Sequence, residues 1–136
     1  MKTINLNKLG DTGRFGEDAA VKHLIDLGYE IIGRNVICSG NEIDIVARDM
    51  RYIVFVEVKT RKNYDKLSRF GPPRAAVNKE KQNRIISAAR AYLKESPQRR
   101  VPRFDVIEVY VDTYKTTLKL TKSITYRELL ARGDKR

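Results

Sequence analysis

The chain of 136 residues carries 28 Lys and Arg against 17 Asp and Glu, which gives it a net charge of +11. This length predicts one domain with a core large enough to fold without disulfides, and the single cysteine, Cys38, excludes an intramolecular disulfide and a cysteine-based zinc site. A positive excess on this scale indicates a polyanionic partner, with nucleic acid as the first candidate.

The hydropathy of the chain narrows its class further. It has no stretch of about 18 or more consecutive apolar residues, and its N-terminus lacks the apolar segment of a signal peptide. We therefore expect a cytoplasmic protein with no membrane partner, in which Cys38 stays reduced. Residues 1–136 are expected to form a single domain, with a core over about 13–121 and a short terminal helix and tail over 122–136.

The first predicted element is a helix from about Gly13 to Leu27, which Gly28 ends as a helix breaker. Its apolar stripe is expected to comprise Ala20, Val21, Leu24 and Leu27. Glu17 precedes the first three of these by three, four and seven positions, so it falls on the same stripe. A carboxylate there is unusual, because burying a charge without a partner is costly.

Three strands are predicted next. The first spans Glu30–Ile37 and contains Gly33, which suggests a bulge or a close backbone approach. The other two lie within Asn41–Arg61 and are joined by a short turn at 48–51, so they should be antiparallel neighbours. The last of them, 52–59, is apolar on both faces and should therefore be central and covered on both sides.

Charged residues interrupt this apolar pattern at one place. Glu57 and Lys59 lie at the end of the central strand, on the face that also carries Ile53 and Phe55. The same period of two places Glu42 and Asp44 together on one face of the preceding strand. If the two strands pair, three carboxylates and a lysine converge, which indicates a functional site.

The next two elements are rich in basic residues. Residues 60–77 read as a long basic loop with interleaved Tyr64 and Phe70, able to follow a phosphate backbone or to serve only as a solvated connector. A helix should run from an Asn78 cap to about Glu95. Its basic first turns oppose the helix dipole unless phosphates lie nearby, although a merely solvated helix end is the alternative. The expected nucleic-acid-binding residues are Arg34, Arg61, Lys62, Arg69, Arg74, Lys79, Lys81 and Arg84.

The C-terminal part predicts a strand and a hairpin. Residues 99–103 read as a basic linker, 104–111 as a strand and 115–120 as its hairpin partner. The T-x-x-E spacing of Thr125–Glu128 favours a short terminal helix. The whole order, helix, three strands, helix and strand, is satisfied by one mixed α/β sheet with helices on both faces.

The converging charges suit phosphodiester hydrolysis. A hard divalent cation needs oxygen ligands, which the Asp44 and Glu57 carboxylates and the Val58 carbonyl can supply. Lys59 can orient a water or stabilise charge on the phosphate, and Glu17 can reach the cluster as a further or water-bridged ligand. We therefore expect Mg²⁺ or Mn²⁺ as the cofactor.

Several motifs also carry a family resemblance. Asp44 followed by Glu57-Val58-Lys59 resembles the D…(D/E)-x-K signature of restriction-endonuclease-like nucleases. The chain further resembles the YraN-like family of bacterial proteins, similar to archaeal Holliday-junction resolvases, through G-R-x-G-E-x-x-A-x-x-x-L, G-Y-x-I-x-x-R-N, E-I-D-I-V-A, V-F-V-E-V-K-T-R, F-G-x-P and R-F-D-V-I. The resemblance implies a restriction-endonuclease-like αβββαβ fold, with Glu17, Asp44, Glu57 and Lys59 as the metal and catalytic set. The chain departs from the family at Asn41, where glycine is usual, which puts the geometry of that turn in question.

Other roles stay open for some of these residues. Glu57 and Lys59 would also form a plain ion pair, and Glu42 is expected to be structural, pairing with Arg34 or a backbone amide. Asp105 is likewise expected to be structural. The favoured function is a metal-dependent endonuclease acting on DNA rather than RNA, selective for branched or junction structures, with a homodimer to address two strands. The alternative is a nucleic-acid-binding module that keeps the fold without turnover, which predicts salt-dependent binding.

Overall fold

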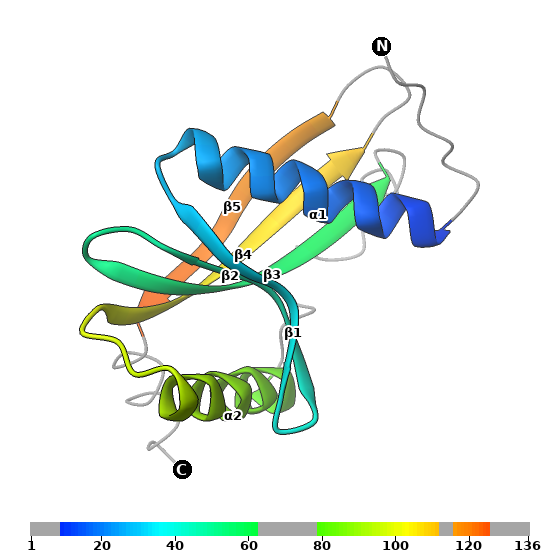
Figure 1. The fold of residues 1–136 in the computed structure, drawn as a ribbon. Helices are drawn as coiled ribbons and strands as arrows, with labels where there is room; N and C mark the ends of the chain where they lie inside the picture. The colour runs from blue at the N-terminus through cyan, green and yellow to red at the C-terminus, as the bar shows by residue number, and fades with distance from the viewer. Residues whose placement is uncertain (1–8, 63–78, 112–115, 126–136) are drawn as a thin grey trace.

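The computed structural model describes residues 9–62, 79–111 and 116–125 and forms one five-stranded sheet with two helices (Figure 1). In chain order the elements are α1 (Leu9–Asp26), β1 (Glu30–Cys38), β2 (Asn41–Arg48), β3 (Tyr52–Lys62), α2 (Lys79–Glu95), β4 (Val101–Val111) and β5 (Thr116–Thr125). The strands lie side by side in sequence order. Only β3 and β4 are parallel neighbours, and the other pairs are antiparallel. The predicted mixed α/β sheet and the αβββαβ order are confirmed.

The two helices cover opposite faces of the sheet, so β3 is buried on both sides (Figure 1). The core under α1 consists of Ala20, Leu24, Ile45, Ala47, Val54, Val56, Ile107, Val109 and Val111. The core under α2 consists of Ile43, Val46, Ile53, Phe55, Ala88, Ala89 and Phe104. The alternation along β3 therefore separates its two apolar faces as the sequence predicts.

Several predicted boundaries are wrong at the N-terminal side. Helix α1 begins at Leu9, four residues before Gly13, and ends at Asp26. Leu27 is 61% exposed instead of joining the apolar stripe, because the chain turns at Gly28, whose φ is +97°. The bulge expected around Gly33 is present between Ile31 and Gly33.

The C-terminal strands are longer than predicted. Strand β4 includes the expected linker residues 101–103, since Val101 pairs with Tyr52 and its amide donates a hydrogen bond to the Arg51 carbonyl. Strand β5 continues to Thr125 and thus beyond the predicted core limit at 121. The rest of the predicted terminal helix lies outside the described residues, as do the Asn78 cap and most of the predicted basic loop; the first part of that loop, Thr60–Lys62, continues β3.

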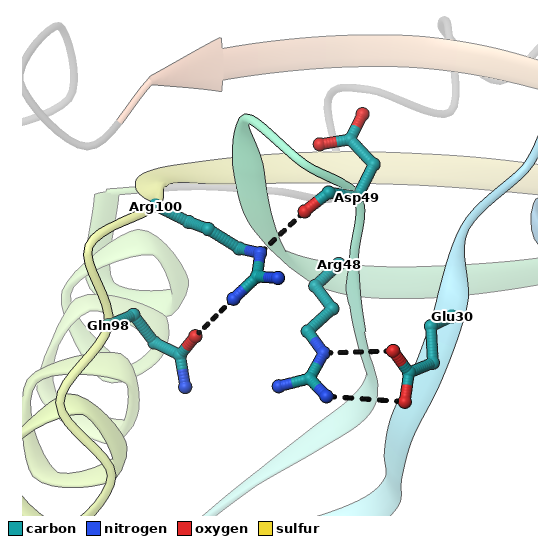
Figure 2. Close-up of polar contacts among 5 residues, drawn as sticks. All are labelled: Glu30, Arg48, Asp49, Gln98 and Arg100. Atoms are coloured by element: carbon teal, nitrogen blue, oxygen red, sulfur yellow. Dashed lines mark hydrogen bonds and ion pairs between the residues drawn. The ribbon is translucent and has the colours of Figure 1, made fainter.

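Two arginine side chains form hydrogen bonds at the end of the sheet where β2 turns into β3 (Figure 2). Arg48 forms two hydrogen bonds with the Glu30 carboxylate, at 3.1 and 3.2 Å. Arg100 donates to the Asp49 carbonyl and to the Gln98 side chain, which ties the segment between α2 and β4 to this turn. A part of the positive charge is therefore used in structural contacts.

Arg103 is another structural cation. It forms two hydrogen bonds with the buried Asp105, at 2.9 and 2.8 Å, and donates to the Tyr29 hydroxyl at 2.7 Å. Its guanidinium also lies 4.7 Å from the centre of the Tyr52 ring. Asp105 is only 3% exposed and is held by this pair, in agreement with its expected structural role.

Helix α1 lies directly on β3 at Gly16. A Cβ atom at this position would lie 1.8 Å from Thr60 Oγ1 and 2.9 Å from Thr60 Cβ. Glycine in a helix costs about 0.5–1 kcal/mol relative to alanine. Here it allows a close approach that sets where the next residue, Glu17, stands.

Replacing Gly16 by alanine should therefore destabilise the protein, despite the better helix propensity of alanine. We expect Gly16→Ala to lower the free energy of unfolding by about 1–3 kcal/mol, the usual cost of overpacking, measured by urea denaturation. The control is Gly13→Ala in the same helix, since a Cβ at Gly13 meets no atom within 4 Å. Equal stability of the two variants would contradict the close approach.

Candidate active site

The site begins where β2 separates from β3. The antiparallel ladder between these strands runs from Arg48–Ile53 to Ile45–Val56 and goes no further. Beyond it, the Asp44 carboxylate accepts a hydrogen bond from the Val58 backbone amide at 2.8 Å. The Asp44 carboxylate therefore accepts from a backbone amide that would otherwise pair with the β2 backbone. The Asp44 side chain thus lies between the two strands where they separate.

A tight turn closes the β1–β2 hairpin beside this opening. Ser39 and Gly40 have φ angles of 54° and 75°, as in a two-residue type I′ turn, and Cys38 pairs with Asn41 across it. Asn41 is therefore a strand residue. The glycine that is usual in the family at this position is not needed for the turn, because the two left-handed residues are Ser39 and Gly40.

A pocket of about 260 Å³ lies between the hairpin, β3 and α2. Its lining residues are Gly40, Asn41, Glu42, Asp44, Glu57, Arg84 and Ile85. Asp44 and Glu57 thus come together as predicted, and helix α2 brings a cation, Arg84, to the same pocket. Arg84 also pairs with Glu80 at 2.6 Å on the exposed surface of the helix.

Lys59 stands next to Glu57, two residues further along β3. Its Nζ atom lies 3.1 Å from Glu57 Oε1, and the two side chains are only 19% and 14% exposed. The ion pair weighed in the sequence analysis is therefore formed. An ammonium group carries three donors, so this contact is compatible with a second one to a phosphate oxygen.

The Asp44 carboxyl is difficult to ionise. Burial raises its pKa from 3.8 to about 7, with further contributions from the negative charges of Glu57, Glu17 and Glu42. The hydrogen bond from the Val58 amide acts in the opposite direction but is outweighed. Without a cation, the Asp44 carboxyl holds a proton near neutral pH, whereas a bound cation would favour its ionised form.

Glu17 reaches the site from α1, on the other face of the sheet. It is 23% exposed in its side chain and lies 3.8 Å from Arg34, which forms its shorter contact, at 2.7 Å, with Asp18. Arg34 thus contacts acids of α1, whereas the sequence analysis had offered it as a partner of Glu42. Glu17 and Glu42 instead share a partner that sequence reasoning missed, the side-chain amide of Asn35.

Within residues 9–62, 79–111 and 116–125, no three His, Cys, Asp or Glu side chains lie close enough together to hold a metal ion. Asp44 and Glu57 therefore form a two-carboxylate site. Mg²⁺ is commonly held by one or two carboxylates together with water and substrate phosphates, so the pair and the Val58 carbonyl suit such an ion. Glu17 contributes charge to Asp44 across the opening.

The predicted nucleic-acid-binding residues are placed only in part. Arg84 lines the pocket, Arg34 stands beside the acids of α1, and Arg61 follows Lys59 on the same face of β3. The side chains of Lys62, Lys79 and Lys81 lie outside the described structure, as do Arg69 and Arg74.

The model of the Uncharacterised protein family UPF0102 matches residues 16–109, which include every described residue of the site. The chain belongs to UPF0102. A UPF0102 protein of Clostridium botulinum (strain 657 / Type Ba4) is 42% identical over 117 residues, covering 83% of this chain and 92% of the relative. One of Caldanaerobacter subterraneus subsp. tengcongensis is 39% identical over 125 residues, covering 91% of this chain and 97% of the relative. The YraN-like resemblance is thereby confirmed.

In the described part of this UPF0102 chain, neither helix has the length and apolar character needed to cross a membrane.

Because the pKa of Asp44 is raised, removing its charge by mutation should stabilise the folded protein by an amount that depends on pH. The folded protein binds the Asp44 proton more tightly than the unfolded chain, whose pKa is about 3.9. The stability that this proton contributes is therefore fully present below pH 4 and is lost as the pH rises through about 7. Asp44→Asn keeps an oxygen for the Val58 amide and removes the charge. In metal-free buffer, its advantage over the wild type should grow by about 2–3 kcal/mol between pH 5 and pH 8, measured by urea unfolding.

The matched control is Asp26→Asn, which removes an exposed carboxylate at the end of α1. Its stability should follow that of the wild type over the same pH range. An Asp44→Asn variant that is no more stable than the wild type at pH 8 would show that the carboxyl is not strained by its surroundings.

Proposed function

We propose that this protein is a metal-dependent DNA endonuclease with a restriction-endonuclease-like fold. The observation that carries the proposal is the pocket in which Asp44 and Glu57 meet at the opening of the sheet, with Lys59 held against Glu57. Paired oxygen ligands, a neighbouring ammonium and a surplus of positive charge are the elements that phosphodiester hydrolysis needs.

Asp44, Glu57 and the Val58 carbonyl are the groups that would hold Mg²⁺ or Mn²⁺. Asp44 supports this assignment because its burial, and then the charges of three neighbouring carboxylates, oppose its ionisation, a conflict that a divalent cation relieves. When bound, the ion would supply positive charge to the phosphate and make a water molecule more acidic. Glu17 would add its negative charge to the field at Asp44 without binding the ion directly.

Lys59 and Arg84 would serve the phosphate. Lys59, already close to Glu57, would donate to a non-bridging phosphate oxygen and stabilise the charge that develops there. Arg84 faces the same pocket from α2 and would hold the neighbouring phosphate through its planar, two-pronged donor set. Both contacts read the backbone and carry no sequence information.

The substrate class follows from charge and size. A net charge of +11 on 136 residues favours a polyanion, and the few elements around the pocket offer little for reading bases. We therefore infer selectivity for branched or junction DNA over a particular sequence, in keeping with the similarity of the YraN-like family to Holliday-junction resolvases, with DNA preferred to RNA. A homodimer would let two sites address two strands, and a cytoplasmic location completes this proposal.

A second function is favoured by one observation. Lys59 already neutralises Glu57, as in a protein that binds nucleic acid but has no need of a metal ion. Such a binding module would retain the fold and the charge without turnover. It would bind DNA with an affinity that falls steeply as salt rises, and it would take up no Mn²⁺ at Asp44 and Glu57.

Cleavage assays test the first function directly. The substrates are a four-way junction, a flap, a nicked duplex and a linear duplex of matched sequence, each titrated with Mg²⁺ and Mn²⁺. We expect metal-dependent cleavage of the branched forms by the wild type, and a loss of at least about 100-fold in kcat for Asp44→Ala and Glu57→Ala. Asp26→Asn, which changes the net charge equally, should retain activity.

Two results would overturn the nuclease function. One is absence of cleavage by the wild type on every substrate, and the other is equal cleavage by the wild type and the two alanine variants. Salt-dependent binding without cleavage, together with no heat of Mn²⁺ binding in calorimetry, would establish the binding module in its place.

Lys59 offers a way to separate metal binding from chemistry. Lys59→Met removes a cation 3.1 Å from Glu57, so the carboxylates should bind Mn²⁺ at least as tightly as in the wild type, measured by calorimetry. The same variant should cleave at least about 100-fold more slowly, because the developing phosphate charge loses its donor. Cleavage at the wild-type rate would remove Lys59 from the chemistry.

A further inference from the structure

Asn35 has an unusual backbone conformation in the strand beside the site. Its φ angle is +50°, in the left-handed region that side chains with a Cβ seldom adopt. It lies in β1 between Arg34 and Val36, which pair with Ile45 and Ile43, so its register position is opposite Asp44. Left-handed residues outside turns cost free energy and concentrate at functional sites.

The side chain of Asn35 lies between two carboxylates. Hydrogen bonding requires that its amide nitrogen face them, and this nitrogen then donates to Glu42 Oε1 at 2.8 Å and to Glu17 Oε1 at 3.1 Å. A primary amide has two N–H donors, so both contacts form at once. The two acceptors come from separate elements, α1 and β2, on either side of β1 in the chain.

These two carboxylates would otherwise lie close together without a shared donor. In the described structure, Arg34 is the one cation that contacts Glu17, at 3.8 Å, and it lies closer to Asp18, at 2.7 Å. The negative charges of Glu17 and Glu42 both act on Asp44. The Asn35 amide thus contacts both of the carboxylates whose charges act on Asp44 from α1 and β2.

We propose that Asn35 is a positioning residue of the site: its left-handed backbone carries the side-chain amide between Glu17 and Glu42 and holds both carboxylates beside the Asp44 pocket, where they strengthen the binding of a divalent cation. The cation belongs to the proposed function, on which this inference rests. The linkage of Glu17 to Glu42 is a feature of the protein without metal.

A simpler reason for an asparagine at this position is backbone tolerance alone, because Asn accepts left-handed angles better than most residues. Glycine distinguishes the two explanations. Asn35→Gly allows the backbone conformation and removes the amide, whereas Asn35→Asp keeps the size of the side chain but replaces the donor by a third carboxylate. Ser39→Gly is the matched control, since it replaces another left-handed residue, φ +54°, with no carboxylate partner in the described structure.

The first measurement is Mn²⁺ titration by calorimetry. We expect Asn35→Gly to weaken Mn²⁺ binding at least fivefold, and Ser39→Gly to leave it unchanged. Equal Mn²⁺ affinity in Asn35→Gly and the wild type would overturn the inference.

The second measurement needs neither metal nor substrate. In thermal unfolding of the metal-free protein, Asn35→Asp should lower Tm by several degrees relative to Asn35→Gly, and Glu42→Gln should remove most of this difference. Equal Tm values for the Asp and Gly variants would contradict the bridge between Glu17 and Glu42.

Cleavage assays keep this inference separate from the nuclease function. If the wild type cleaves DNA, Asn35→Gly should lower kcat and raise the Mn²⁺ concentration for half-maximal rate, with little change in KM for DNA. If nothing is cleaved but the Mn²⁺ and Tm differences appear, the nuclease function fails and the role of Asn35 stands. If the wild type and Asn35→Gly cleave with the same Mn²⁺ dependence, the role of Asn35 fails and the nuclease function stands.

Discussion

The hydrogen bond from the Val58 amide to the Asp44 carboxylate is the contact on which the site depends. It lets β2 separate from β3 on the N-terminal side of Ile45 without leaving the partly buried Val58 amide unpaired, which would be costly. The sheet can therefore open at the end of a strand that is covered on both faces. Because the same carboxylate also faces Glu57, the opening that relieves the backbone creates an electrostatic conflict in the side chains.

The two apolar faces of β3 were predictable because a strict period of two fixes which side chains share a face. The same rule placed Glu57 and Lys59 with Ile53 and Phe55, and the short turn before Tyr52 made the antiparallel pairing with β2 predictable. Local rules of this kind also gave the helices and the bulge near Gly33. For the candidate site, these rules predicted Asp44 on β2 and Glu57 and Lys59 on β3, but not which side chains contact Glu17 and Glu42.

The parts that were missed depend on contacts between distant segments. Nothing local marks Val101 as a strand residue, since its pairing with Tyr52 exists only once β4 lies beside β3. Leu27 has the right spacing for the core, but the turn at Gly28 carries it into solvent. Asn35 looked like an ordinary polar strand residue, because its function lies in a dihedral angle and in two acids that come from other elements.

The contact between Gly16 and Thr60 has a consequence for how the site can change during evolution. A helix resting on a strand with ordinary side chains between them can slide or rotate slightly as those side chains vary. Here the Gly16 backbone and the Thr60 side chain meet directly, so a shift of α1 along β3, which would carry Glu17 with it, is opposed by Thr60. A side chain at position 16 would therefore fit only if residue 60 became smaller or α1 moved away from β3.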